Sequence, residues 1–239
     1  MRISIIAFIY RGTCLTQEQR IVAMQVLDDS SCIGDYLVRN IRQKDYFDCS
    51  RINFMCQPEK VSDKMMECLN TLNMDVPFDK NYFNWTDEEK QEYLYELAYN
   101  SFHTLCQRKN WDFEVVKSKL EELKALNFCY SFDTGLRCTQ DKITVKLIGV
   151  HTMKKISFYV MSKKFGDKRI LMHEAGPHVL DYGWSLGKLV WLNENTVALI
   201  DKTNKLENSI DLSNEINEVK AKGNTAVSRK TNKTKGDKK

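Results

Sequence analysis

Prolines and glycines are scarce in this sequence, with three and ten among 239 residues, and no apolar run approaches the ~20 residues of a membrane-spanning helix. The chain also shows no internal repeat with a period of 20–50 residues. These absences argue against a low-complexity chain, a membrane span and a solenoid. Hydrophobic residues at 42% and charged residues at 28% are typical of a globular protein.

Several motifs that would indicate a reaction are missing. The sequence contains no GxxxxGK[ST] or GxGxxG phosphate loop, and none of its eight cysteines forms a CxxC pair. The apolar start at residues 3–9 is followed by Arg11 and has no small-x-small cleavage site, so we expect a buried central strand there rather than a signal peptide. We therefore expect reduced thiols, a cytoplasmic protein, no membrane partner and no cofactor.

Charge is distributed unevenly along the chain. Residues 220–239 hold eight Lys or Arg against Asp237 alone, which gives +7, whereas the whole chain carries +4. Residues 1–219, which we call the acidic body, therefore carry −3, and the positive net charge of the whole chain comes from residues 220–239. Residues 214–239 contain too few apolar side chains to compensate for the entropy of ordering them, so we expect a disordered tail.

The hydrophobic periodicity predicts an α+β protein. A mixed N-terminal region, residues 1–84, combines strands at 3–9 and 51–56 with helices near 17–26, 31–43 and 59–72. Thr86 and Glu89 form a capping box that begins a helix, and Asp112 begins a second one, so we expect a central helical hairpin. From Lys142 the period changes to two, which predicts an antiparallel β-meander. We treat residues 85–213 as hairpin plus sheet, in one domain with residues 1–84 or separate from them.

Two histidines suggest a metal site. His173 and His178 flank Glu174 and a Gly-Pro turn, but their i, i+5 spacing across that turn does not fit the helical HExxH motif. Exposed turn histidines are the simpler interpretation, and a metal-dependent hydrolase that uses both residues is the alternative.

Aromatic residues near the same turn suggest a protein contact. Trp184 lies between Gly183 and Gly187, where a large side chain can project, and indole rings are common interface anchors. We expect Trp184, Tyr182, His178 and Glu174 to contact a partner protein. The tail offers a different surface, because Arg229, Lys230, Lys233 and Lys235 could bind nucleic acid through phosphate contacts.

Three segments together resemble cytosolic immunity proteins of bacterial polymorphic toxin systems. They are the capped helix start at 85–89, the Asn110-Trp111-Asp112 junction and the terminal stretch at 189–197. The resemblance covers about residues 85–201 and lies in the layout of the elements. It implies a non-enzymatic protein that binds and neutralises a cognate toxin, and the acidic body would suit a basic toxin. The hydrolase and a nucleic-acid-binding accessory protein remain the alternatives.

Overall fold

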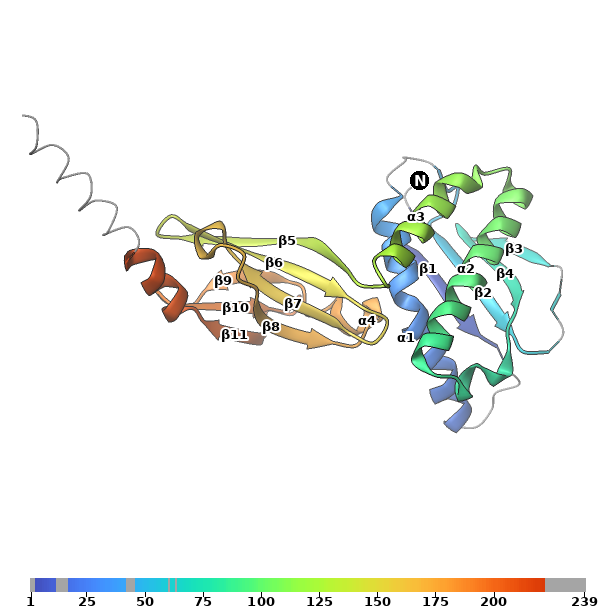
Figure 1. Cartoon of the computed structure of the whole chain (residues 1–239), viewed down its shortest axis with the longest axis horizontal. Coiled ribbons are helices and arrows are strands. Elements are labelled where there is room, and N and C mark those ends of the chain that lie inside the picture. Colours follow the sequence, from blue (N-terminus) through green and yellow to red (C-terminus); the bar gives the residue numbers. More distant parts are fainter. Residues whose placement is uncertain (1–2, 12–16, 42–45, 60, 63, 222–239) are drawn as a thin grey trace, which may run out of the picture. The chain divides into compact units, whose positions relative to one another are not determined.

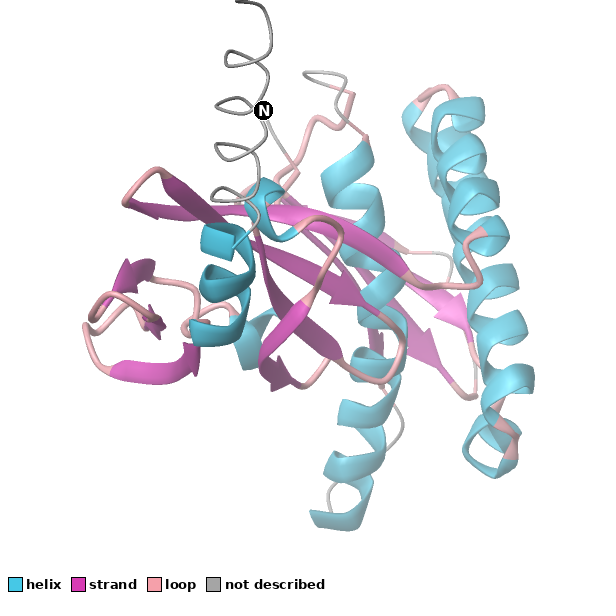
Figure 2. Ribbon diagram, turned by 60° about the vertical axis from the view of Figure 1, so that its left-hand side comes forward, coloured by secondary structure: helices cyan, strands magenta, loops and turns pink. Residues whose placement is uncertain are grey.

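The computed structural model describes residues 3–11, 17–41, 46–59, 61–62 and 64–221, and it divides into two compact units. Unit 1 comprises Met1–Tyr130, His151–Ile156 and Ala175–Asp181. Unit 2 comprises Ser131–Val150, Ser157–Glu174 and the described part of Tyr182–Lys239. Helices and antiparallel sheets both contribute substantially, so the predicted α+β class is confirmed (Figure 2).

Unit 1 is built on a four-stranded sheet with the order β1-β2-β4-β3 (Figure 1). Strands β1, β2 and β4 run parallel, and β3 runs antiparallel to β4. The strands are β1 (Ile5–Tyr10), β2 (Arg51–Gln57), β3 (Met65–Cys68) and β4 (Thr71–Pro77). The helices are α1 (Gln17–Asn40), α2 (Asp87–Lys109) and α3 (Phe113–Ala125), preceded by the short 3-10 helix η1 (Lys80–Asn84).

One face of this sheet packs on the helices through aromatic side chains. Phe8 of β1 stacks on its register partner Phe54 of β2, with ring centroids 4.8 Å apart. Phe54 in turn contacts Phe102 of α2 edge-on at 4.9 Å. All three rings are fully buried. Parallel register partners share a face of the sheet, so Met74, the partner of Phe54 on β4, also faces the helices.

Helix α1 lies unusually close to β1 at Gly34. A Cβ added to Gly34 would overlap the carbonyl oxygen of Ile6, a backbone atom that cannot rotate away. Only glycine permits this approach of helix to strand.

The two predicted helix starts are confirmed. The Thr86 side chain accepts from the Glu89 amide at 3.3 Å, and the Glu89 carboxylate accepts from the Thr86 amide at 2.8 Å. Asp112 caps α3 by accepting from the Glu114 amide at 3.1 Å. Helix α2 ends at Asn110, which adopts a left-handed conformation with φ of 54°.

Unit 2 contains two antiparallel sheets, with the orders β5-β6-β7-β8 and β11-β10-β9. The side chain of Asn208 on β11 donates to the Met172 carbonyl on β8, which ties the two sheets together. The strands are β5 (Tyr130–Gln140), β6 (Ile143–His151), β7 (Ile156–Met161), β8 (Ile170–Ala175), β9 (Lys188–Trp191), β10 (Thr196–Ile200) and β11 (Leu206–Asp211). This unit also contains the short helix η2 (Lys163–Phe165) and a helix at residues 213–221, whereas α4 (Val179–Tyr182) belongs to unit 1 except for Tyr182.

The prediction of a helix over residues 59–72 is wrong. Residues Met65–Cys68 and Thr71–Pro77 instead form the β3–β4 hairpin, which turns at Leu69 and Asn70, both with positive φ. The helices expected at 17–26 and 31–43 are one continuous helix, α1. The first strand was expected to be central, but β1 is an edge strand of its sheet.

The predicted tail begins inside a folded segment. Its expected start at residue 214 falls within the helix at 213–221, where Ile216 is buried. The remaining residues, 222–239, lie outside the described part of the chain.

We predict that Gly34→Ala destabilises the protein. In an exposed helix this change would add up to ~1 kcal/mol of stability. Here the added methyl group must displace the Ile6 backbone, so we expect a loss of about 1–3 kcal/mol, measured by urea unfolding. Ser118→Ala, on the exposed face of α3, serves as the control and should change stability by less than ~0.5 kcal/mol. An unchanged or higher stability for Gly34→Ala would contradict the close packing.

Candidate binding groove beside strand β4

Strand β4 is paired unequally on its two sides. Its partnership with β2 runs over the full length, from Thr71 to Pro77. Its partnership with β3 covers only Thr71 to Met74. The outer edge of β4 from Asp75 to Pro77 therefore has no partner strand in the described part of unit 1.

The direction of the free peptide groups follows from the strand geometry. The Phe78 amide donates to the Gln57 carbonyl of β2 at 2.9 Å. Peptide groups of a strand alternate between its two sides, so those of Val76 also face β2. The N–H and C=O of Asp75 therefore face outward, as does the C=O of Pro77.

A cavity of about 700 Å³ lies along this edge. Helix α2 forms its second wall. The helix runs antiparallel to β4. Near the start of α2, the ring of Tyr93 lies 5.5 Å, between centroids, from that of Phe78, which follows the end of β4. At the end of α2, Lys109 Nζ lies 2.6 Å from Glu67 of β3, which pairs with Leu72 near the start of β4. We call this cavity the α2–β4 groove.

The groove combines an apolar wall with a polar rim. Met74, Val76, Phe78 and Leu97 are buried and supply apolar surface. Four residues spaced every four positions on α2 line the other side, which places them on one face of the helix. They are Glu96, Asn100, Thr104 and Arg108.

Among the described residues that line the groove, negative charge predominates. They include the carboxylates of Glu59, Asp75, Asp79 and Glu96 and one guanidinium, that of Arg108. The Gln57 amide donates to Asp75 at 3.2 Å, which orients that carboxylate at the strand edge. The sequence alone does not reveal this site. The i, i+4 polar series on α2 is visible in it, but the pattern over residues 59–72 predicts a helix where β3 and the start of β4 lie, and no strand is predicted over the rest of β4.

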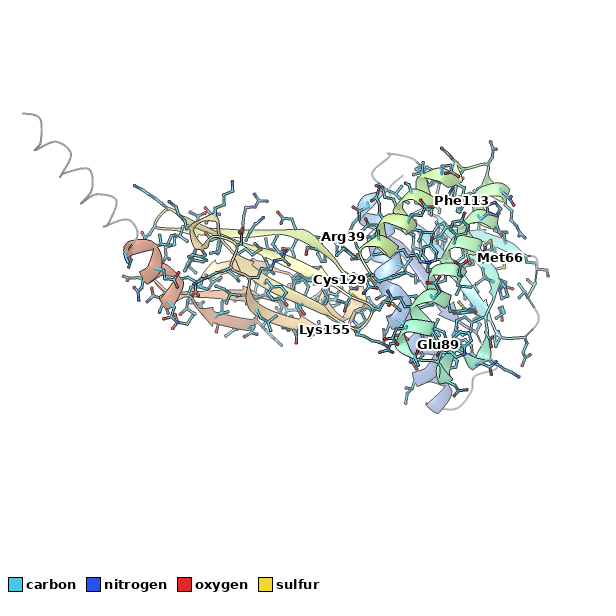
Figure 3. The ribbon with its side chains drawn as sticks, viewed as in Figure 1. Arg39, Met66, Glu89, Phe113, Cys129 and Lys155 are labelled. Carbon is cyan, nitrogen blue, oxygen red and sulfur yellow. The ribbon has the colours of Figure 1, made fainter. Side chains whose placement is uncertain are left out.

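A second polar cluster in unit 1 is buried. Asp35 of α1 accepts hydrogen bonds at 2.7 Å from Tyr130 Oη and from Arg39 Nε, the residue labelled in Figure 3. His151 Nδ1 lies 3.2 Å from Asp35 and 3.1 Å from Tyr130 Oη. Since the Tyr130 proton points to Asp35, we infer that Nδ1 carries a proton. Burial raises the pKa of Asp35, but the contacts with His151, Arg39 and Tyr130 outweigh burial and lower it to about 2.

This cluster offers little room for a ligand. Tyr130 and His151 are buried, and the cavity beside Asp35 has a volume of only about 40 Å³. We therefore interpret the cluster as structural, because it holds Tyr130 and His151 against Asp35 of α1 within unit 1. Nothing in the sequence pointed to it, since Asp35 and His151 are 116 positions apart.

The predicted contact residues do not form one surface. Trp184 is 65% exposed, whereas Tyr182 is buried against Phe158 at 5.7 Å and cannot present its ring to a partner. Glu174 is exposed and accepts from Ser157 Oγ at 2.6 Å. His178 is partly buried in unit 1, and its Nδ1 accepts from the Leu180 amide at 3.3 Å. Burial lowers the pKa of His178.

The loop that carries Trp184 is fixed by its own backbone. The Trp184 carbonyl accepts from the Lys202 amide at 2.9 Å, and the Lys202 ammonium lies 5.9 Å from the indole centroid. A Cβ on Gly187 would overlap the backbone of Asp201, so this glycine is needed for the close approach. Trp191 on β9 is only partly buried.

The same loop also fits a hydrolase pattern, because Gly183–Gly187 reads GxSxG. A nucleophile elbow joins a strand to a following helix. Here the segment follows the short helix α4 and leads into strand β9, and Ser185 is buried. Among the described residues no hydrogen bond joins Ser185 to a histidine. The motif therefore lacks the structural context of an elbow.

The two predicted metal ligands belong to different units. His173 of unit 2 stacks on Phe158, and its Nε2 lies 3.6 Å from Glu207. No set of three or more His, Cys, Asp or Glu in the described ranges is arranged to hold a metal. The nucleic-acid candidates Arg229, Lys230, Lys233 and Lys235 lie outside the described residues.

Comparisons with protein families, curated proteins and solved structures find no match for this chain. Across the part that the structure describes, no helix combines the length and apolar character needed to cross a bilayer. The seven cysteines that the structure describes are all free thiols.

We predict that Asp35 makes stability depend on pH in acid. Its pKa is lowered from 3.8 to about 2 in the folded state, so it stabilises the protein above pH ~4. That contribution, about 2 kcal/mol, is lost as the pH falls from 4 to 2. The difference in unfolding free energy between the parent and Asp35→Asn should therefore shrink by about this amount over that range, as measured by urea unfolding.

Glu121→Gln, at an exposed carboxylate of α3, is the matched control for the loss of a carboxylate, and the Asp35→Asn difference is compared with it over the same pH range. A difference for Asp35→Asn that stays flat between pH 4 and pH 2 would show that its carboxylate has no lowered pKa.

Proposed function

We propose that this chain acts by binding another protein, and that the α2–β4 groove is the main contact region. The observation that carries the proposal is the unpaired edge of β4 beside a cavity of about 700 Å³ with an apolar wall and a polar rim. Exposed strand edges pair with other chains, and an apolar centre within a polar rim is the usual composition of a protein interface.

A finer form of the proposal is that the partner is a toxin domain that this chain neutralises. Its support is the resemblance of residues 85–201 to immunity proteins and the negative charge of the groove, which would attract a basic partner. Co-expression with a candidate toxin domain tests it, since the parent chain should protect cells and a groove-blocked variant should not.

The Trp184 loop is a second candidate contact region. Its exposed indole on an anchored loop is the kind of side chain that dominates interface energetics. We rank it below the groove because Tyr182, its expected neighbour at the interface, is buried.

We predict that Thr104→Trp blocks the groove and weakens partner binding at least tenfold. Thr104 lies partly exposed on the groove face of α2, where an indole would fill part of the cavity. A photo-crosslinking amino acid at position 104 should capture the partner in cells, and affinity for that partner is then measured with purified proteins. Ser118, exposed on α3, provides the matched position for both the crosslinker and the Trp substitution.

The comparison with Trp184→Ala separates the two regions. If Trp184→Ala weakens binding about thirtyfold while Thr104→Trp has no effect, the contact lies at the Trp184 loop and the groove assignment is wrong. Equal capture from positions 104 and 118 would also count against the groove.

A further inference from the structure

We propose that the α2–β4 groove binds an extended, basic segment of the partner protein as an added strand of the unit 1 sheet. This inference rests on the proposed protein-binding function and specifies how the partner is recognised. It follows from three properties of the groove: the backbone it exposes, the side chains that flank that backbone, and its charge.

The backbone at the groove offers a short pairing edge. Asp75 directs its N–H and C=O outward, toward the side on which β3 pairs with the first half of β4. Pro77 has no N–H and offers only its carbonyl. An added strand can therefore exchange two hydrogen bonds with Asp75 and donate a third to Pro77. A helix has no free peptide groups along its length and cannot form these bonds.

The side chains beside this edge suit a strand in which residues alternate between two faces. Residues on the helix side of an added strand would meet Met74, Val76 and Leu97, which are buried and apolar. Residues on the opposite side would meet the side chains of Asp75 and Gln57, which point away from the helices because side chains alternate along β2 and β4. The expected segment therefore has apolar residues at every second position.

The charge of the groove determines which polar residues the bound segment should carry. Asp75 lies on the open side of the edge and Glu96 on the helical rim, so a Lys or Arg side chain can reach a carboxylate from either face. Among the described lining residues four carboxylates outnumber one guanidinium, so an acidic segment would be repelled. The occupant is thus an extended segment that alternates apolar and basic residues.

Displayed random dodecapeptides, selected on the immobilised full-length chain, provide the probe. Selected peptides are synthesised with a fluorescent label, and their affinity is measured by fluorescence anisotropy. We expect enrichment of Lys and Arg at alternate positions with apolar residues between them. Recovery of peptides with apolar residues at helical spacing would overturn the proposal, since such peptides occupy a groove as helices.

N-methylation of the bound peptide tests strand pairing directly. An added strand donates two N–H groups to β4, one to the Asp75 carbonyl and one to the Pro77 carbonyl, from positions two residues apart. Methylation at either of these positions should weaken binding at least tenfold, and methylation at the position between them should change it less than twofold. A uniform response along the peptide, or none at all, would rule out strand addition.

Two substitutions at position 75 separate the contribution of the backbone N–H to peptide binding from that of the carboxylate charge. Asp75→Asn keeps the outward N–H and removes the carboxylate, so binding of basic peptides should fall only a few-fold. Asp75→Pro also removes the N–H, which the ladder with β2 does not use, and should weaken binding at least tenfold further. Equal affinities for the two variants, both with parent-like thermal midpoints, would contradict pairing at Asp75.

A charge reversal on α2 supplies an independent test if Asp75→Pro fails to fold. Glu96→Lys should weaken basic peptides about tenfold, and Glu121→Lys, the same charge change on the exposed face of α3, should change affinity less than twofold. Equal effects of the two reversals would mean that charge acts at long range and not at the groove, and would overturn the proposed contact.

The outcomes for this inference and for the proposed function can be told apart. If position 104 crosslinks a partner and no extended peptide binds, strand addition is wrong while protein binding stands. If peptides bind with the alternating N-methyl pattern and position 104 captures no protein in cells, the mode of recognition stands and the proposed function fails.

Discussion

The unequal pairing of β4 is the constraint on which the binding groove depends. If β3 followed β4 to its end, the peptide groups of Asp75 would be used in the sheet and α2 would cover a closed edge. The ladder ends at Met74 because the hairpin partner begins only at Met65, directly after the segment that follows Pro58. The short β3 therefore covers the outer side of β4 from Thr71 to Met74 and leaves that side open from Asp75 to Pro77.

Helix α2 can keep the open stretch of β4 accessible because its two ends are held separately. Near its start, Tyr93 packs on Phe78, and its hydroxyl accepts a hydrogen bond from the Asp79 amide at 2.7 Å. At its end, Lys109 binds both Asp48 at 2.8 Å and Glu67 at 2.6 Å, and these hydrogen bonds raise its pKa. Between these ends, Phe102 fixes the inner face against Phe54. The polar face from Glu96 to Arg108 is left to line the cavity.

Local signals in the sequence were sufficient for elements whose stability is local. The helix starts at Thr86 and Asp112 and the alternating strands were predicted correctly, because their hydrogen bonds and apolar periods involve neighbouring residues. The failure at residues 59–72 has a different cause. Apolar residues there match a helical period, yet β3 is largely exposed and the turn uses left-handed Leu69 and Asn70. The strand conformation of this segment is decided by the pairing of β4 with β2, and the local sequence carries no signal for that long-range pairing.

The interior of α1 shows the same limit. Asp29 and Ser30 look like a break between two helices, but both are buried within one. Asp29 accepts from the Tyr82 hydroxyl at 2.8 Å, a contact between residues 53 positions apart. The candidate groove combines both problems, because one wall belongs to a correctly predicted helix and the other to a strand that only tertiary pairing defines.

The short length of the open edge has consequences for specificity. An exposed strand edge is an aggregation hazard, and proteins protect such edges with proline, charge and brevity. Pro77 and the Asp75 carboxylate supply the first two, and the interruption after Met74 supplies the third. A second copy of this chain would bring another acidic edge and would be repelled. Three backbone hydrogen bonds contribute little net affinity, so a ligand must also fill the apolar wall and match the negative rim. The features that protect the edge from self-association are thus the ones that would select a basic, alternating partner.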